Sequence, residues 1–109
     1  MHGFTWKDSE KKLARRVFER ARLAELDALI QTFKAEAAAV ADPDQLWALV
    51  DAMHGRRRGF EQKFDFRYSV LPMVFARLLA EGNITEADLQ GLDADKQADI
   101  LRTAQFLSR

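Results

Sequence analysis

The sequence predicts an all-α protein, and three observations support this fold class. No segment of the 109 residues alternates apolar and polar side chains in the way a half-buried β-strand does. Strong helix formers, namely Ala, Leu, Arg, Lys and Glu, fill the longest uninterrupted stretch. Apolar residues of that stretch recur three and four positions apart, which is the period of one helix face. We therefore expect helices throughout and no sheet.

The first expected helix runs from Thr5 or Asp8 to about Ala41. Thr5, followed three positions later by Asp8, resembles a capping box in which Asp replaces the usual Glu. No Gly or Pro interrupts the interior, and the pair Asp42-Pro43 ends the helix because proline cannot continue it.

The second expected helix begins at Pro43 and ends near position 64 or 67. Asp42 can cap its first turn and Gln45 can close a capping box, while Pro43 suits the first helical position. Two glycines inside the helix each weaken it by up to about 1 kcal/mol relative to Ala: Gly55 and Gly59.

Three shorter helices are expected after position 68. Ser69 can cap the first of them, which places Pro72 in its opening turn, and Gly82 can end it in the left-handed conformation. Thr85 opens a capping box that is closed by an aspartate three positions later. Asp93 caps the last helix, which extends toward the C-terminus.

One face of the first helix carries a coiled-coil-like seam. Its apolar residues alternate spacings of three and four positions: Leu23, Leu26, Ile30, Phe33, Ala37 and Val40. One interpretation is that this face packs on the rest of the same chain. The length of the helix favours packing of this face against a second chain. A helix of about 35 residues is roughly 50 Å long, whereas a compact domain of this length is only about 35 Å across.

Such a helix must extend past its own domain, and an apolar seam left in water is unfavourable. We therefore expect a two-fold homodimer, in which the seam meets itself antiparallel or meets the second helix of the partner. The expected interface continues onto the second helix through Leu46, Trp47 and Val50.

Composition excludes several classes of protein. Lys plus Arg equals Asp plus Glu at 17 each, so the net charge of zero argues against nucleic acid or an anionic membrane as the partner. The chain has no Cys, which excludes disulfides and thiol chemistry and is typical of a reducing cytoplasm. The most apolar run, 68–76, is far shorter than the roughly 20 residues of a membrane span. We expect a cytoplasmic protein.

No constellation of residues predicts catalysis. The two histidines, His2 and His54, have no partner at a metal-binding spacing. No serine has a histidine and an acid at a motif spacing, and no glycine-rich phosphate loop is present. We therefore expect no metal, no cofactor and no enzymatic activity.

The densest basic segment, Arg56-Arg57-Arg58, allows three interpretations. It can be a solvated helix face, since arginine stems cover apolar neighbours. It can bind nucleic acid, although acidic residues follow within two turns. It can also recognise a protein, because Trp47 and Asp51 share one face of this helix and Trp and Arg are common interface anchors. Asp51 can reach Arg58 on its own helix or Arg57 of a second chain. Trp47 can alternatively be a core residue at a helix junction.

These residues resemble the cyanobacterial fluorescence recovery protein family over nearly the whole chain. The central pattern is Leu-Trp, then Asp, then two basic residues, in an all-helical context. The matching positions are Trp6, Leu46-Trp47, Asp51, Arg56-Arg57, Lys63, Asp65, Arg67, Ser69-Val70, Val74-Phe75-Ala76, Leu78-Leu79, Glu81-Gly82 and Ala94-Asp95-Lys96-Gln97.

The resemblance implies an elongated all-helical homodimer, in which long paired helices of about residues 6–67 form the body and about residues 68–109 form a small helical head. It implies a non-enzymatic role. Members of the family bind the photoactivated orange carotenoid protein, grip its C-terminal domain and speed its return to the compact dark state. The alternatives from the residues alone are a helical adaptor with another client and a small nucleic-acid-binding regulator.

The resemblance also implies which residues contact the partner. Trp6, Trp47, Asp51 and Arg57 match family positions tied to function or to the integrity of the dimer, and Met73 is a further candidate on the third helix. This chain departs from the family pattern at four positions: Val50 replaces His, Met73 replaces Phe, Asp99 replaces Lys, and Phe66 replaces an acidic residue.

Overall fold

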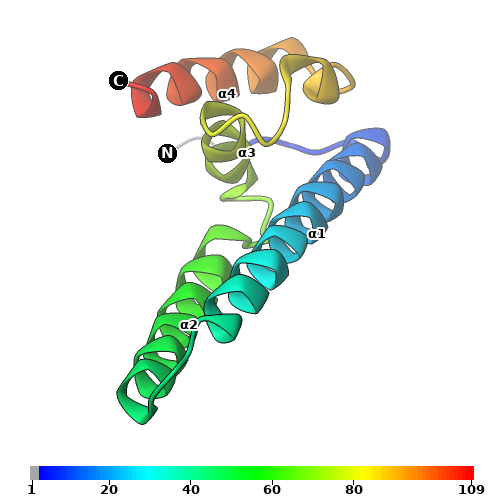
Figure 1. The fold of residues 1–109 in the computed structure, drawn as a ribbon. Coiled ribbons are helices and arrows are strands. Elements are labelled where there is room, and N and C mark those ends of the chain that lie inside the picture. The colour runs from blue at the N-terminus through cyan, green and yellow to red at the C-terminus, as the bar shows by residue number, and fades with distance from the viewer. Residues whose placement is uncertain (1–2) are drawn as a thin grey trace. The chain divides into compact units, whose positions relative to one another are not determined.

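The computed structural model describes residues 3–109, and every regular element in that range is helical (Figure 1). Within this range, four α-helices follow one another: α1 (Asp8–Ala38), α2 (Pro43–Lys63), α3 (Leu71–Ala80) and α4 (Ala94–Leu107). A short 3₁₀ helix, η1 (Glu86–Leu89), lies between α3 and α4. The all-α prediction is confirmed for this part of the chain, and the two long helices come first.

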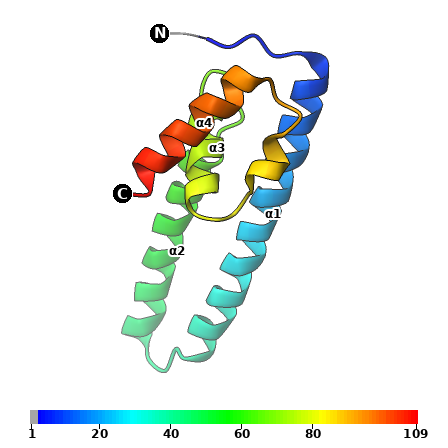
Figure 2. The same ribbon diagram turned by 90° about the horizontal axis from the view of Figure 1, so that it is seen from above.

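The described chain forms two compact units. The core unit combines the N-terminal residues up to Ala21 with Asp65–Arg109. The hairpin unit is Arg22–Phe64, in which the C-terminal half of α1 and the whole of α2 run antiparallel, side by side (Figure 2). Helix α1 therefore contributes its first turns to one unit and its remainder to the other.

Helix α1 begins at Asp8, but the prediction of a capping box formed by Thr5 and Asp8 is wrong. The Glu10 carboxylate instead accepts the backbone N–H of Lys7 at 2.9 Å, so Lys7 is the residue that precedes the helix. Glu10 occupies the third helical position, from which a side chain reaches back to the cap. The Thr5 carbonyl serves another purpose, because it accepts the ammonium of Lys96 at 2.7 Å.

Helix α2 begins at the expected cap, Asp42, but the expected capping box with Gln45 does not form. The Asp42 carboxylate accepts the backbone N–H of Gln45 at 2.8 Å. The Gln45 side chain in turn accepts the N–H of Ala41 at 2.7 Å, one residue before the cap. The helix continues without a break through both of its glycines and ends at Lys63.

Helix α3 has Pro72 in its first turn as expected, but the expected cap at Ser69 is wrong. Val70 is the residue at the cap, and no side chain caps the helix. The carbonyl of Arg67 already accepts the N–H groups of Val70 and Leu71 at 2.9 and 3.0 Å. The chain therefore enters the helix through a turn, and Ser69 lies one residue too early to act as the cap.

The C-terminus of α3 forms a complete Schellman motif around a glycine. Gly82 has φ of +79°, a conformation that costs an L-residue with a side chain about 1–2 kcal/mol. Its N–H is accepted by the carbonyl of Leu79 at 3.1 Å, and the N–H of Asn83 is accepted by the carbonyl of Leu78 at 2.8 Å. The glycine is thus required by the turn and ends the helix as expected.

The last two helices begin at the expected caps. Thr85 and Asp88 form a reciprocal capping box, in which the Asp88 carboxylate accepts the Thr85 N–H at 2.8 Å. Asp93 caps α4, since its carboxylate accepts the backbone N–H of Lys96 at 3.0 Å. Both starts could be predicted because a cap depends on residues only three positions apart.

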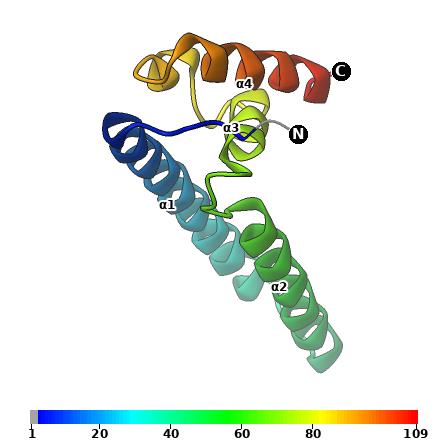
Figure 3. The same ribbon diagram turned by 180° about the vertical axis from the view of Figure 1, so that it is seen from behind.

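The apolar core lies in the core unit, where α3 and α4 pack against each other (Figure 3). A chain of aromatic rings adds to it. Phe18 of α1 meets Phe66 at 5.0 Å between ring centroids, Phe66 meets Tyr68 at 5.6 Å, and Tyr68 meets Trp6 at 5.6 Å. These rings join α1, the segment before α3 and the N-terminal residues.

Candidate protein-binding interface

The hairpin unit carries an apolar groove of about 740 Å³ between the C-terminal half of α1 and α2. Its lining is built mainly from aliphatic and aromatic side chains and includes two arginines. The residues are Leu26, Leu29, Ile30, Phe33, Ala37, Val40, Leu46, Leu49, Val50, Met53, His54, Arg56, Arg57 and Phe60.

Most of the residues expected at a dimer interface line this groove. They are Leu26, Ile30, Phe33, Ala37, Val40, Leu46 and Val50. Leu23 and Trp47, which were also expected there, are exposed and lie outside the lining. The spacing of three and four positions places the α1 members on one face, and antiparallel α2 supplies the opposite wall.

Within the hairpin unit, the groove is uncovered. Ile30 is 48% exposed, and Phe33 and Leu46 are exposed to a similar degree. Leu49, which is 9% exposed, is the only buried apolar residue of the hairpin unit among the described residues. Within the hairpin unit, α2 therefore leaves much of the seam exposed. An apolar face of this kind is typical of a protein-binding surface.

Two ion pairs join α1 to α2 within the hairpin unit. The Arg56 guanidinium lies 2.7 and 2.8 Å from the two carboxylate oxygens of Glu36, and the contact to Oε2 has hydrogen-bond geometry. The hydrogen bond from Arg56 holds the pKa of the Glu36 carboxyl below its usual value. Lys63 donates to Glu25 at 2.6 Å. Both pairs connect residues from facing positions of the antiparallel helices.

The expected partner-contacting residues of α2 are all exposed. Trp47 is 62% exposed, so it is not a core residue within this chain. Asp51 is exposed and makes no ion pair with any described residue. Arg57 lines the groove, and its guanidinium pairs with Glu61 one turn later at 3.0 Å, in a contact that is open to solvent.

Trp6 and Met73 belong to the core unit. Trp6 is only 8% exposed and packs against Tyr68, with the Lys96 ammonium 5.1 Å from its ring. Its indole N–H has no hydrogen-bond partner. Met73 is 56% exposed on α3. Trp6 therefore supports the core from inside, whereas Met73 is available at the surface.

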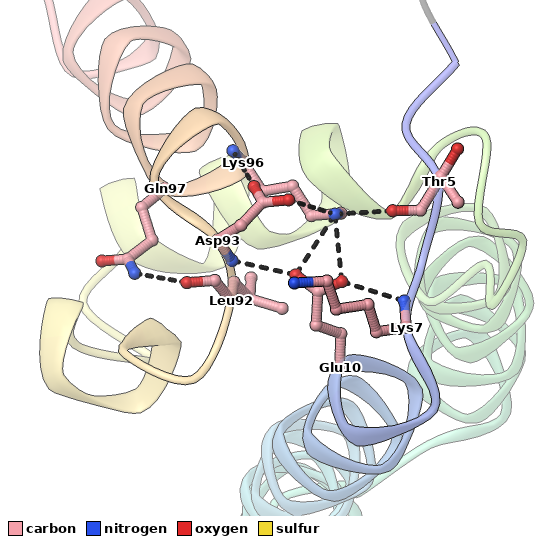
Figure 4. A network of polar contacts seen from close by, with 7 residues as sticks. All are labelled: Thr5, Lys7, Glu10, Leu92, Asp93, Lys96 and Gln97. Carbon is pink, nitrogen blue, oxygen red and sulfur yellow. Dashed lines mark hydrogen bonds and ion pairs between the residues drawn. The ribbon is translucent and has the colours of Figure 1, made fainter.

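A buried ionic centre in the core unit was missed by the sequence analysis (Figure 4). The Lys96 ammonium donates to both Glu10 oxygens at 3.1 and 3.2 Å, to Asp93 at 3.0 Å and to the Thr5 carbonyl at 2.7 Å. Glu10 also accepts the backbone N–H groups of Lys7 and Asp93, each at 2.9 Å. Each of the two charged side chains is about 99% buried.

A signal for this centre is present in the sequence. Lys96, Ile100 and Ala104 lie four positions apart and form one buried stripe of α4, so Lys96 occupies an apolar position. Glu10 continues the stripe of Ala14 and Phe18 on α1 in the same way. Charged residues on apolar stripes are rarely buried unless they are paired. The sequence does not show, however, that Glu10 pairs with Lys96, because it does not show that α1 packs near α4.

Opposing effects act on the ionisation of this centre. Burial raises the pKa of Glu10. Hydrogen bonds from the Lys7 and Asp93 N–H groups and from Lys96 lower this pKa by a larger amount, so the net pKa is below the usual value. Burial lowers the pKa of Lys96, and its bonds to Asp93 and Glu10 raise it to a net value above the usual one. Both groups are therefore held in their charged forms.

Two further features are absent from the described part of the chain. Residues 3–109 contain no group of three or more His, Cys, Asp or Glu side chains placed to hold a metal ion, and His2 lies outside this range. None of the helices described there combines the length and apolarity that crossing a membrane requires.

Comparison with known proteins gives matches along almost the entire chain. The model of a family described as "Photoprotection regulator fluorescence recovery protein" matches residues 6–104. The fluorescence recovery protein of Synechocystis sp. PCC 6803 is 38% identical over 101 residues, which are 93% of each chain.

Solved structures agree with this match. The structure of the Fremyella diplosiphon fluorescence recovery protein has a TM-score of 0.87 and 33% identity, and that of the Synechocystis protein has a TM-score of 0.87 and 38% identity. Each comparison covers 93% of this chain and 99% of the other.

Proposed function

Because this chain belongs to the fluorescence recovery protein family, we propose that it binds the photoactivated orange carotenoid protein and accelerates its return to the compact dark state. The match to the family over residues 6–104 carries this proposal. The family is one of photoprotection regulators, which confirms the non-enzymatic role implied by the resemblance.

The proposed mechanism is binding of one conformational state in preference to others. A regulator with equal affinity for the extended and compact forms of its client would not change their balance. The chain must therefore bind most tightly to states of the client that lie on the path to the compact form. This mechanism requires no covalent step and no cofactor.

We propose that the working form is a homodimer assembled through the groove of the hairpin unit. The charge distribution of α2 supports this arrangement. Its start carries Asp42 and Asp44, whereas three consecutive arginines, 56–58, lie near its other end. A two-fold axis that runs two α2 helices antiparallel would place the acidic start of one beside the basic end of the other.

Each unit has its own proposed client contacts. Trp47, Asp51 and Arg57 would contact the client from α2, and Met73 from α3, where each is exposed. Arg57 offers a planar fork of donors that suits a carboxylate of the client. Trp6 would contribute indirectly, because it is buried and stabilises the core unit.

The departures from the family pattern bear on affinity. Met73 keeps an exposed apolar side chain where the family has Phe, although with less rigid contact area. Asp99 reverses a charge, and it pairs with Arg102 on α4 at 3.3 Å. We therefore expect activity on a cyanobacterial carotenoid protein to be weaker than that of the Synechocystis relative.

The test is the rate of relaxation of a photoactivated orange carotenoid protein from its red to its orange form. The unmodified chain should shorten the relaxation half-time. Arg57→Leu should remove most of this effect, since loss of an interface arginine costs about 2 kcal/mol or more, which is roughly thirtyfold in affinity. Asp51→Leu should have a similar effect, and the double variant should be less than additive if both residues act together.

Arg16→Leu is the matched control. It makes the same substitution at an exposed position of α1 in the core unit, which does not line the groove. It should leave the half-time near that of the parent. If Arg57→Leu behaves like the parent, the assignment of Arg57 is wrong. If the unmodified chain has no effect while the Synechocystis protein does, the client is a different protein.

A further inference from the structure

Burial is distributed very unequally between the two units. Sixteen apolar side chains are buried among residues 3–109, and all but Leu49 belong to the core unit. The core unit encloses large side chains such as Phe75, Leu78 and Ile100 completely. The hairpin unit has no comparable interior, because its apolar residues face the open groove.

A hairpin of two helices with this little burial is not expected to be stable alone. Helices in proteins are held mainly by packing of an apolar face, and isolated helices of this length are marginal in water. Units of about 40 residues usually need a disulfide, a metal or association with another chain. Cysteine is absent from the sequence. The hairpin unit therefore depends on association.

The polar contacts of the hairpin do not replace a core. The Glu36–Arg56 pair is partly exposed on both sides, and such pairs contribute at most about 1 kcal/mol. The better buried Lys63–Glu25 pair must first offset the desolvation of two charges. These pairs set the register of the two helices, while the energy for ordering about 40 residues has to come from elsewhere.

We propose that the hairpin unit folds only when a second copy of this chain covers its groove, while the core unit is folded in the monomer as well. This inference rests on the proposed homodimer. The second copy is favoured as the cover by the seam of α1 and by the opposite charges at the two ends of α2, which are complementary in an antiparallel pair. The two compact units meet in the sequence inside α1, between Ala21 and Arg22, and the proposed folding boundary lies there.

Dissociation of the dimer is then also an unfolding event. The monomer would consist of a folded core unit and a flexible segment that carries Trp47, Asp51 and Arg57. Binding of a second copy supplies the energy that orders this segment, so its order depends on protein concentration. Any client that displaces the second copy would have to cover the groove itself or bind the segment in an unfolded form.

Hydrogen exchange of backbone amides, measured segment by segment on the full chain, tests this inference. On dilution through the dimer dissociation constant, amides of residues 22–64 should lose their protection and approach the exchange rate of unstructured chain. Amides of α3 and α4 should keep theirs. The helical circular dichroism should fall by about half, because about half of the α-helical residues lie in the hairpin unit.

A pair of variants gives the same test at fixed concentration. Ile30→Glu places a carboxylate in the groove and should produce a monomer with an unprotected hairpin unit and a protected core unit. Ala35→Glu adds the same group to an exposed position of α1 outside the groove and should match the parent. Sedimentation gives the oligomeric state of each sample.

Several results would overturn the inference. A monomer, whether diluted parent or Ile30→Glu, with a protected hairpin unit would show that the hairpin folds alone. Loss of protection in α3 and α4 together with 22–64 would show a single cooperative unit. A dimer that persists in Ile30→Glu would show that the groove is not the interface. The relaxation assay on the carotenoid protein is independent of these results, so failure of the client assignment would be seen separately.

Discussion

At the scale of single residues, the buried centre of Glu10, Lys96 and Asp93 is the most demanding arrangement in the molecule. Two charges are removed from water, and each is satisfied by several partners, including backbone groups of Thr5 and Lys7. Buried ion pairs contribute little by themselves, but removing one partner leaves an uncompensated charge. The centre therefore joins the N-terminal segment to the start of α4 in a specific geometry.

Substitutions at this centre should have unequal effects. Glu10→Gln leaves one acceptor oxygen for three donors and should lower the free energy of unfolding of the core unit by about 3 kcal/mol. Lys96→Met should cost less, because the Glu10 carboxylate keeps its two backbone donors. Urea unfolding followed by Trp6 fluorescence in a Trp47→Phe background reports on the core unit alone, since the chain has two tryptophans. A larger loss for Lys96→Met would contradict this account.

The same groups predict how stability depends on pH. The pKa of Glu10 is lowered in the folded state, so its contribution is present above the unfolded value of about 4.3 and is lost as pH falls through the folded value. The pKa of Lys96 is raised, so its contribution is present below about 10.4 and is lost as pH rises through the folded value. Asp88 and Asp93 also have lowered pKa values and add to the loss in acid.

The core unit should therefore have nearly constant stability between about pH 6 and pH 9 and lose stability below about pH 4. Urea midpoints of the Trp47→Phe protein across this range are the measurement. Glu10→Gln should show a smaller loss in acid than its parent. Equal losses in the two proteins would mean that Glu10 does not contribute to the acid dependence.

At the scale of helices, the ends are determined by short-range signals of different strength. The caps at Asp42, Thr85 and Asp93 form as the local sequence indicates. The start of α3 does not, because the turn before it already uses the carbonyl of Arg67. Glycines have opposite effects at different places: Gly82 is required by a left-handed turn, whereas Gly55 and Gly59 weaken α2, which continues through both of them.

Two glycine substitutions should therefore shift thermal stability in opposite directions. Gly82→Ala forces a side chain into a φ of +79° and should lower stability by about 1 kcal/mol. Gly59→Ala places a methyl group in open space in the middle of α2 and should raise helix stability by up to about 1 kcal/mol. Thermal unfolding followed by circular dichroism compares them, and shifts of the same sign would contradict the assignment.

At the scale of the whole molecule, the chain divides its tasks between a unit with its own core and a hairpin whose apolar face is open. The net charge of zero and the ordinary hydrophobic content describe the chain as a whole, so they do not reveal that one unit leaves an apolar groove exposed. In the proposed dimer, a second chain would supply the other half of a core for the apolar residues of the hairpin.

Leu46→Glu should convert the proposed dimer to monomers. Leu46 lines the groove, so in the assembly the variant would bury a carboxylate without a partner, a change that costs several kcal/mol. Gln62→Glu adds a charge to an exposed position of α2 outside the groove and is the matched control. Sedimentation equilibrium distinguishes the outcomes, and a parent that is monomeric at micromolar concentration would contradict the proposed dimer.

The sequence alone was sufficient for the features that depend on neighbouring residues. The helical period, three of the caps, the glycine that ends α3 and the seam on α1 all arise from residues within a few positions of one another. The resemblance to the family was also visible in the sequence, because its pattern of Leu-Trp, Asp and two basic residues lies on a single helix.

Only the tertiary structure decided the features that join distant segments. Glu10 and Lys96 are 86 positions apart, and their pairing depends on how α1 and α4 pack. The burial of Trp6 and the exposure of Trp47 could not be distinguished from sequence, since an aromatic residue suits both a core and an interface. The physical reason is that local periodicity determines which face of a helix is apolar, whereas packing determines what, if anything, covers that face.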